Sequence, residues 1–161
     1  MKRLIALTAG LCALAGAAHA QDIVRGGDPK AAIASVVTVP AGYDTIYVSG
    51  MTPPVIDEKA TGVAKFGDTK TQTLGVLGRI EAALKTQGAT MADVVMMRVL
   101  LVGDPAKGGK MDFAGMMEGY KQFYGTEAQP NKTARITSQV AALVAPGMMV
   151  EIEVQAAKPK K

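Results

Sequence analysis

The chain has 161 residues, a formal net charge of +4, one Cys and one His. Cys12 and His19 both lie in the first twenty residues, so a chain without that segment has neither a thiol nor an imidazole. This excludes Cys or His nucleophiles, disulfides and zinc sites of the usual His/Cys kind, and leaves acid–base chemistry to Asp, Glu, Tyr, Lys or water. The small net charge gives no general case for a nucleic-acid partner.

Residues 1–20 have the layout of a cleaved secretory signal peptide. Two basic residues precede an apolar run over residues 4–15, and Ala18-His19-Ala20 supplies an A-x-A cleavage site. The apolar run is too short to span a bilayer. We therefore expect cleavage after Ala20, a periplasmic or secreted mature protein, and no membrane segment after cleavage.

Residues 21–32 are polar and contain Gly26-Gly27-Asp28-Pro29, which predicts a flexible leader before a single domain over residues 33–157. Regular structure is expected to begin near the start of that domain. Two strands are expected at about 33–39 and 45–50. The segment between them contains Pro and Gly and favours a turn, so the pair is expected to form a hairpin.

Residues 69–87 predict an amphipathic helix, because apolar residues recur there at helical spacing. Asp68 is placed to cap the start of this helix, and Gly88 is placed to end it. A second helix is expected to follow Asp112 and to end at Gly125, with its aromatic and Met residues on one side.

Three further strands are expected at about 94–102, 134–141 and 149–156, which gives a β-β-α-β-α-β-β order before a Lys-rich tail at 158–161. The strand at 94–102 is apolar on both alternating faces, as expected of a central strand that is covered on both sides. Two helices can cover one face of such a sheet. We therefore expect another copy of the chain to bury the other face.

Arg135, Thr137 and Gln139 share one face of their predicted strand, because side chains alternate along a strand. A guanidinium binds a carboxylate through two parallel hydrogen bonds, so Arg135 and Thr137 are candidates for binding one small acid. The alternative is a surface arginine in a weak ion pair.

Glu151 and Glu153 share a face of the last predicted strand. If that strand forms a hairpin with the strand of Arg135, one glutamate lies near the arginine, where it can hold a water and move protons. Solvated, outward-facing glutamates are the alternative. Arg98 lies within the apolar strand, where a charge is rare unless paired, so we expect it in a pocket, at an interface or beside a buried carboxylate.

Short segments spread over residues 32–156 carry a further pattern. They are Tyr47-Val48-Ser49-Gly50, Gly67-Asp68, Gln72-Thr73, Val94-Val95, Asp112-Phe113, Tyr120, Phe123-Tyr124, Ala134-Arg135 and Val150-Glu151-Ile152-Glu153. In this order and spacing they resemble the RidA family, also called YjgF or L-PSP. The resemblance implies an α/β (α+β) fold of the chorismate-mutase-like kind, with two helices on one face of the sheet. It also implies a homotrimer with sites in clefts between subunits.

The activity implied by the resemblance is hydrolysis of reactive 2-imino and 2-enamino acids to 2-keto acids and ammonia, without a metal or a cofactor. In the family an arginine matching Arg135 clamps the substrate carboxylate, and a glutamate matching Glu151 helps to position the attacking water. Ser49 matches a small polar residue beside the site, Gly50 allows close backbone approach, and Thr137 can hydrogen-bond. An iminium carbon is already electrophilic, so the reaction needs mainly orientation, complementary charge and a proton acceptor.

Two positions depart from the family pattern. Its typical deaminases carry a tyrosine before the first hairpin turn, where this chain has Ser35-Val36-Val37, and a cysteine at the position of Thr137. These departures leave open a non-catalytic protein that binds small carboxylates in the same clefts, or a holdase-like partner of other exported proteins. Ribonuclease activity is disfavoured, because the mature chain lacks His and has no basic stripe interleaved with aromatics.

Overall fold

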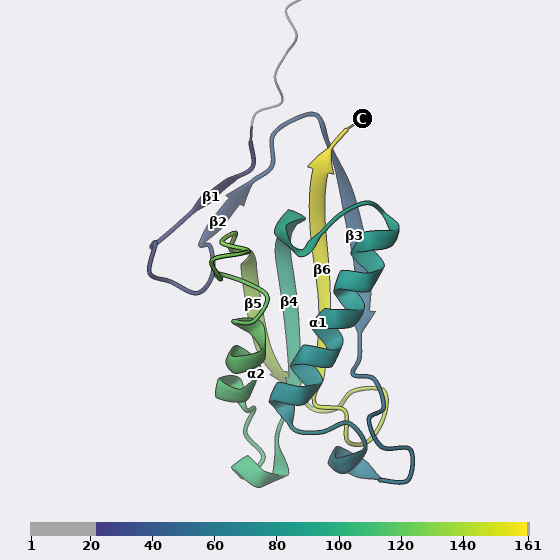
Figure 1. Cartoon of the computed structure of the whole chain (residues 1–161). Coiled ribbons are helices and arrows are strands. Elements are labelled where there is room, and N and C mark those ends of the chain that lie inside the picture. Colours follow the sequence, from purple (N-terminus) through teal and green to yellow (C-terminus); the bar gives the residue numbers. More distant parts are fainter. Residues whose placement is uncertain (1–21, 161) are drawn as a thin grey trace, which may run out of the picture.

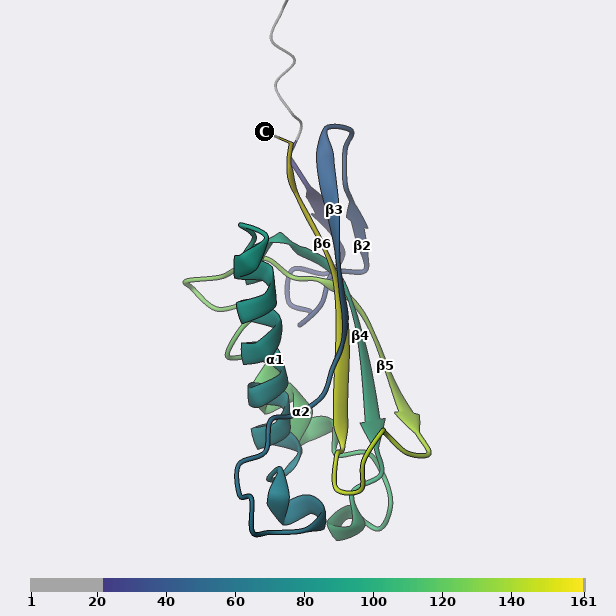
Figure 2. The ribbon, with the colours of Figure 1, turned by 90° about the vertical axis from the view of Figure 1, so that its right-hand side faces the viewer.

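Two helices lie on one face of a four-stranded sheet, and the opposite face is uncovered (Figures 1 and 2). The computed structural model describes residues 22–160; the predicted signal peptide with its cleavage point lies outside this range. The main sheet has the order β3-β6-β4-β5, in which only β4 and β5 run parallel. The strands and helices are β1 (Val24–Gly26), β2 (Val36–Thr38), β3 (Tyr43–Met51), α1 (Thr69–Thr86), β4 (Val94–Val102), α2 (Phe113–Tyr120), β5 (Ala134–Val140) and β6 (Val150–Pro159), with short 3₁₀ turns at Gly62–Lys65, Met91–Asp93 and Pro105–Lys107.

Helix α1 forms where the sequence predicts it. Its N-cap, Asp68, accepts a hydrogen bond of 2.8 Å from the backbone N–H of Thr71, and Gly88 follows its end with a φ of 63°. The apolar stripe of α1 is completely buried against the sheet through Leu77, Ile80 and Leu84. Local capping and one apolar face together determine this helix.

The cap at Asp68 gives the first testable prediction. Backbone hydrogen bonding from Thr71 holds the pKa of Asp68 below its usual value. An Asp68→Ala variant should therefore lose about 1 kcal/mol of unfolding free energy at neutral pH. The stabilisation is complete above the unfolded-state pKa and is lost as pH falls through the lower folded-state pKa. Urea unfolding at pH 7 and pH 3 should show the difference shrinking at pH 3. Asp68→Asn keeps a capping oxygen, so its unfolding free energy should remain close to that of the parent at both pH values. An equally large loss in Asp68→Ala at pH 3 and pH 7 would contradict the role of the ionised Asp68 as the cap.

The central strand β4 has two different faces. Met97, Val99 and Leu101 are fully buried under the helices, whereas alternate residues lie on the uncovered face. On that face Arg98 forms an ion pair of 2.9 Å with Glu153, and both side chains remain about half exposed. Arg98 thus pairs with a carboxylate on the neighbouring strand β6, but this carboxylate is not buried as the sequence predicts.

The predicted first hairpin is wrong. β2 pairs with β1 in a separate two-stranded sheet, while β3 pairs with its neighbour β6 in the main sheet. β1 lies inside the segment predicted to be a flexible leader, so regular structure begins earlier than expected. The reason is Arg25, whose guanidinium donates to the carbonyls of Ala92 at 2.8 Å and Lys132 at 3.2 Å and ties β1 to the body of the domain.

The last two strands, β5 and β6, do not form a hairpin with each other. β4 lies between β5 and β6 and pairs with both. A strand that is apolar on alternating faces is the natural centre of such a sheet, and it separates the two strands that follow it in the sequence. β6 also continues through Lys158 and Pro159 into the predicted tail, pairing with Tyr43 and Asp44.

Helix α1 and the loop before β6 are connected by the side chain of Gln72. This side chain is fully buried and donates to the carbonyls of Gly67 at 2.8 Å and Gly147 at 2.9 Å. Its oxygen accepts from the backbone N–H of Met149 at 2.7 Å. The bonds fix the start of α1 against the start of β6.

Within residues 22–160, neither α-helix combines the length and the apolar character that a membrane crossing needs.

Candidate functional site

Arg135 lies on the helix-covered face of the sheet, in register with the buried Met97 of β4. Its guanidinium carbon is 4.4 Å from the ring centroid of Tyr120 and 5.8 Å from that of Phe113, both on α2. Its Nη1 atom is buried without a hydrogen-bond partner, and no ion pair joins Arg135 to a carboxylate in the described part of the chain. A half-buried cation without an anion is a candidate binding group for one.

Thr137 shares this face with Arg135, as the strand alternation predicts. It is in register with the buried Val99, and its hydroxyl is also buried without a partner. The next side chain on this face, Gln139, already has two partners: it donates to the carbonyl of Gly109 at 2.9 Å and accepts from Met111 N–H at 2.8 Å. Arg135 and Thr137 therefore retain free hydrogen-bonding groups on β5, whereas Gln139 contacts the loop before α2.

Burial sets the electrostatics beside β5. It lowers the pKa of Arg135, because a charge removed from water is less stable, and the neighbouring Tyr120 partly offsets this effect. Burial raises the pKa of the Tyr120 phenol in turn, against the opposing influence of Arg135. The phenol thus stays neutral at physiological pH. A bound carboxylate beside Arg135 would favour the charged guanidinium further.

Glu151 lies on the uncovered face of the sheet, opposite Leu100 of β4. One of its carboxylate oxygens packs directly against the backbone of Gly50, in the space that a Cβ at Gly50 would occupy. Ser49 and Gly50 form the irregular part of the β3–β6 pairing. Ser49 is exposed and lies in a shallow groove between β3 and the end of α1. Gly50 and Glu151 therefore lie side by side on neighbouring strands of the sheet.

The structure does not bring Arg135 and Glu151 together within one chain. Arg135 faces the helices, Glu151 faces the uncovered side, and β4 lies between their strands. The hairpin that would have placed a glutamate beside Arg135 is absent from the described sheet because β4 takes the intervening position. A single site containing both residues requires two chains.

The contact between Gly50 and Glu151 can be tested directly. A methyl group at Gly50 should displace the carboxylate, because nothing else can move as easily as the end of that side chain. Gly50→Ala is expected to change the unfolding free energy by less than about 1 kcal/mol while shifting the ¹³C resonance of the Glu151 carboxyl group. Gly78→Ala is the control, since a Cβ there meets open space. An unchanged Glu151 resonance in Gly50→Ala would rule out the contact.

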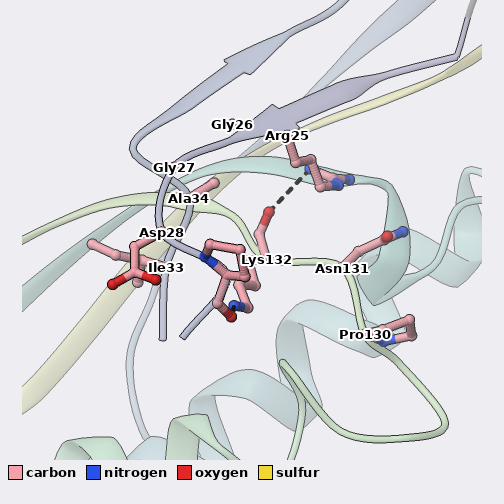
Figure 3. Close-up of a pocket in the computed structure, with 10 residues that line it drawn as sticks. Arg25, Gly26, Gly27, Asp28, Ile33, Ala34, Pro130, Asn131 and Lys132 are labelled. Atoms are coloured by element: carbon pink, nitrogen blue, oxygen red, sulfur yellow. Dashed lines mark hydrogen bonds between the residues drawn. The ribbon is translucent and has the colours of Figure 1, made fainter. Parts of the chain in front are cut away.

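A separate pocket of about 330 Å³ lies between β1 and the loop before β5 (Figure 3). Arg25, Asp28 and Lys132 line it, but each is already bound to the protein backbone. Arg25 donates to two carbonyls, Lys132 Nζ donates to Pro29 O at 2.5 Å, and Asp28 accepts from Lys30 N–H at 2.8 Å. None of the predicted site residues lines this pocket. These bonds hold the loop in place.

The sequence interpretation missed the two aromatic rings beside Arg135. Phe113 and Tyr120 were placed on the apolar side of the second helix, with no relation to the arginine. Their spacing of seven residues puts them on one helix face two turns apart. This spacing indicates a contact with Arg135 only when the fold is known to place that helix face against β5. Among residues 22–160 no group of three or more His, Cys, Asp or Glu side chains is arranged to hold a metal ion.

Comparison with known proteins agrees with this architecture. The sequence model of a family described as Endoribonuclease L-PSP matches residues 28–158. The chain belongs to the RidA/YjgF/L-PSP family. A RutC family protein from Pyrococcus horikoshii is 34% identical over 113 residues, which cover 70% of this chain and 79% of that relative.

Solved structures of RidA/YjgF/L-PSP members share the fold. A Rid family protein of unknown function from Yersinia pestis superposes with a TM-score of 0.60 at 24% identity, covering 79% of this chain and 87% of its own. Escherichia coli TdcF with bound serine gives a TM-score of 0.57 at 28% identity, covering 74% and 84% of the respective chains. The predicted α+β fold with two helices and a mixed sheet is confirmed, and a homotrimer is typical of this family.

Proposed function

We propose that this protein hydrolyses reactive 2-imino and 2-enamino acids to 2-keto acids and ammonia. The observation that carries the proposal is the half-buried guanidinium of Arg135, which has an unpaired buried nitrogen and no carboxylate partner in the described chain. Its planar donors suit a carboxylate, and Thr137 adds a free hydroxyl on the same face. The serine bound in the related TdcF supports a small carboxylate as the class of ligand.

The reaction needs only groups that this chain possesses. Arg135 holds the substrate carboxylate and Thr137 hydrogen-bonds beside it, so the C=N carbon is fixed in one orientation. Water adds to that carbon while Glu151 accepts a proton from the water. That proton passes to the nitrogen and gives a carbinolamine. A second proton then moves from the carbinolamine hydroxyl through Glu151 to the nitrogen, the C–N bond breaks, and ammonia leaves as the carbonyl forms. An enamino acid enters the same sequence after protonation at carbon and loss of a proton from nitrogen convert it to the imine.

The proposed site is shared between two subunits. Arg135 and Glu151 lie on opposite faces of one sheet, so Arg135 of one subunit must meet Glu151 of a neighbouring subunit. The uncovered face carries exposed apolar side chains, including Tyr47 and Ile136, which are suited to burial by another copy. The homotrimer typical of the family supports this arrangement.

Mixed assemblies test the shared site. Chains with Arg135→Ala and chains with Glu151→Gln should each form inactive trimers. When the two are co-expressed, random assembly in equal amounts should put both native residues into about a quarter of the interfaces. Imine hydrolysis should therefore return to about a quarter of the parent activity. Mixed trimers that remain inactive, although the chains co-assemble, would contradict a site built from two chains.

A second candidate is a protein of the same fold that binds small carboxylates without turnover, or that holds other exported proteins. It is favoured by Val36, which stands at the position of the family's tyrosine and projects from β2 with 56% of its surface exposed. Valine has no hydroxyl to donate or accept a proton. Pyruvate binding that depends on Arg135, without any acceleration of imine hydrolysis, would favour this candidate over the enzyme.

We also propose that the domain works outside the cytoplasm, on the strength of the signal-peptide pattern in residues 1–20. Intact-mass measurement of protein recovered from the periplasm or the medium should show a chain that begins at Gln21. A full-length chain that stays in the cytoplasm would contradict export.

A further inference from the structure

The ring of Tyr120 is the surface against which the guanidinium of Arg135 lies. Tyr120 is the last residue of α2 and is 1% exposed. Its ring stacks on that of Tyr124, with centroids 4.9 Å apart and planes inclined by 17°. Its hydroxyl donates to the carbonyl of Ala32 at 3.3 Å. The ring is therefore held at its face and at its tip, so its orientation is fixed.

This arrangement differs from the usual way in which proteins hold a buried arginine. A carboxylate partner would occupy the hydrogen-bond donors of the guanidinium and would compete with an incoming acid. An aromatic face attracts the cation through its π electrons and uses none of those donors. The buried, unpartnered Nη1 of Arg135 shows the result: the cation is held in place while a donor remains free.

We propose that Tyr120 is a positioning residue, whose ring orients the guanidinium of Arg135 for a substrate carboxylate. This inference rests on the proposed function, in which Arg135 binds that carboxylate. Phe113 contributes less to the same role, because its ring is farther from the guanidinium and 43% exposed.

The ring and the hydroxyl of Tyr120 have separable roles. The ring faces Arg135, whereas the hydroxyl donates to the backbone carbonyl of Ala32. Burial raises the pKa of Tyr120, so the phenol acts as a neutral group here and supplies no charge to the arginine. If the role is positioning, phenylalanine should replace Tyr120 and an aliphatic side chain should not.

Two measurements test the proposal in the full-length assembled protein. The first is the ¹H shift of Arg135 Nε–H, which a ring at this distance should move upfield. Tyr120→Phe should keep this shift and Tyr120→Met should lose it. The second is pyruvate affinity by calorimetry. Tyr120→Met should weaken pyruvate binding about tenfold, and Tyr120→Phe should stay within about twofold of the parent. Adding Tyr120→Met to Arg135→Ala should cause no further loss of kcat/KM for imino-acid hydrolysis, since the two residues act as one unit.

Several results would overturn the inference. Unchanged pyruvate affinity in a folded Tyr120→Met protein would do so, and so would an equal loss in Tyr120→Phe, which would assign the effect to the hydroxyl. If the Met variant does not fold, the parent still decides, because an Arg135 Nε–H resonance without an upfield shift contradicts the stacking. Failure of the proposed function has a different signature: Arg135→Ala would leave pyruvate affinity unchanged while the resonance of the parent still reports the stack.

Discussion

Replacing Arg135 with alanine is expected to lower kcat/KM for imino-acid hydrolysis by about a hundredfold and to abolish measurable pyruvate binding. The guanidinium offers two parallel, charge-assisted hydrogen bonds to a carboxylate in a half-buried position, and each such bond contributes about 1.5–3 kcal/mol. Removal of the cation also leaves the ring of Tyr120 without its partner. The cost should fall mainly on substrates that carry a carboxylate.

The loss of hydrolysis in Arg135→Ala can be measured with imines that an amino-acid oxidase generates in situ. Semicarbazide traps the imines that escape hydrolysis. Arg135→Lys is the matched variant: it keeps the charge but loses the planar pair of donors, so it should recover only part of the activity. An imine without a carboxylate should be hydrolysed equally by the parent and by Arg135→Ala. An unchanged rate for the carboxylate-bearing imine, in a correctly assembled Arg135→Ala protein, would remove Arg135 from the site.

The largest expected effect on stability comes from Gln72→Leu. Leucine keeps the apolar volume near that of glutamine but leaves the carbonyls of Gly67 and Gly147 and the N–H of Met149 without partners. A buried polar group that loses its hydrogen bond costs about 1–3 kcal/mol. We therefore expect the unfolding free energy to fall by about 3 kcal/mol or more, because the start of α1 and the start of β6 are no longer joined.

Urea unfolding followed by circular dichroism at fixed protein concentration should measure this loss. Gln122→Leu is the control, since Gln122 is exposed and the change should stay within about 0.5 kcal/mol. A loss below about 1 kcal/mol in Gln72→Leu would mean that water or a rearranged loop satisfies the three backbone groups.

Helix α1 and strand β4 could be predicted because their signals are local. Asp68 caps α1, its apolar stripe meets the sheet, and the two-faced apolar pattern identifies β4. Strand pairing could not be predicted in the same way. β1 has three residues, and it is held by bonds from Arg25 to carbonyls 67 and 107 positions away in the sequence. No local pattern records such distant contacts.

In the candidate site, too, the local features could be predicted and the contacts between distant residues could not. Strand alternation correctly placed Arg135 with Thr137 and Glu151 with Glu153. Alternation alone does not say which face meets the helices, and that choice depends on the insertion of β4 between the two strands. The role of Tyr120 was hidden for a related reason, because a buried aromatic residue on a helix has the same sequence pattern whether or not a cation lies against it.

The opposite orientations of Arg135 and Glu151 have a consequence for how the protein responds to dilution. If each site is completed by a neighbour, an isolated chain has no complete site. Specific activity should then decrease as dilution separates the chains, and high local concentration should restore it. Association would act as the switch that makes the protein active, with no additional regulatory domain.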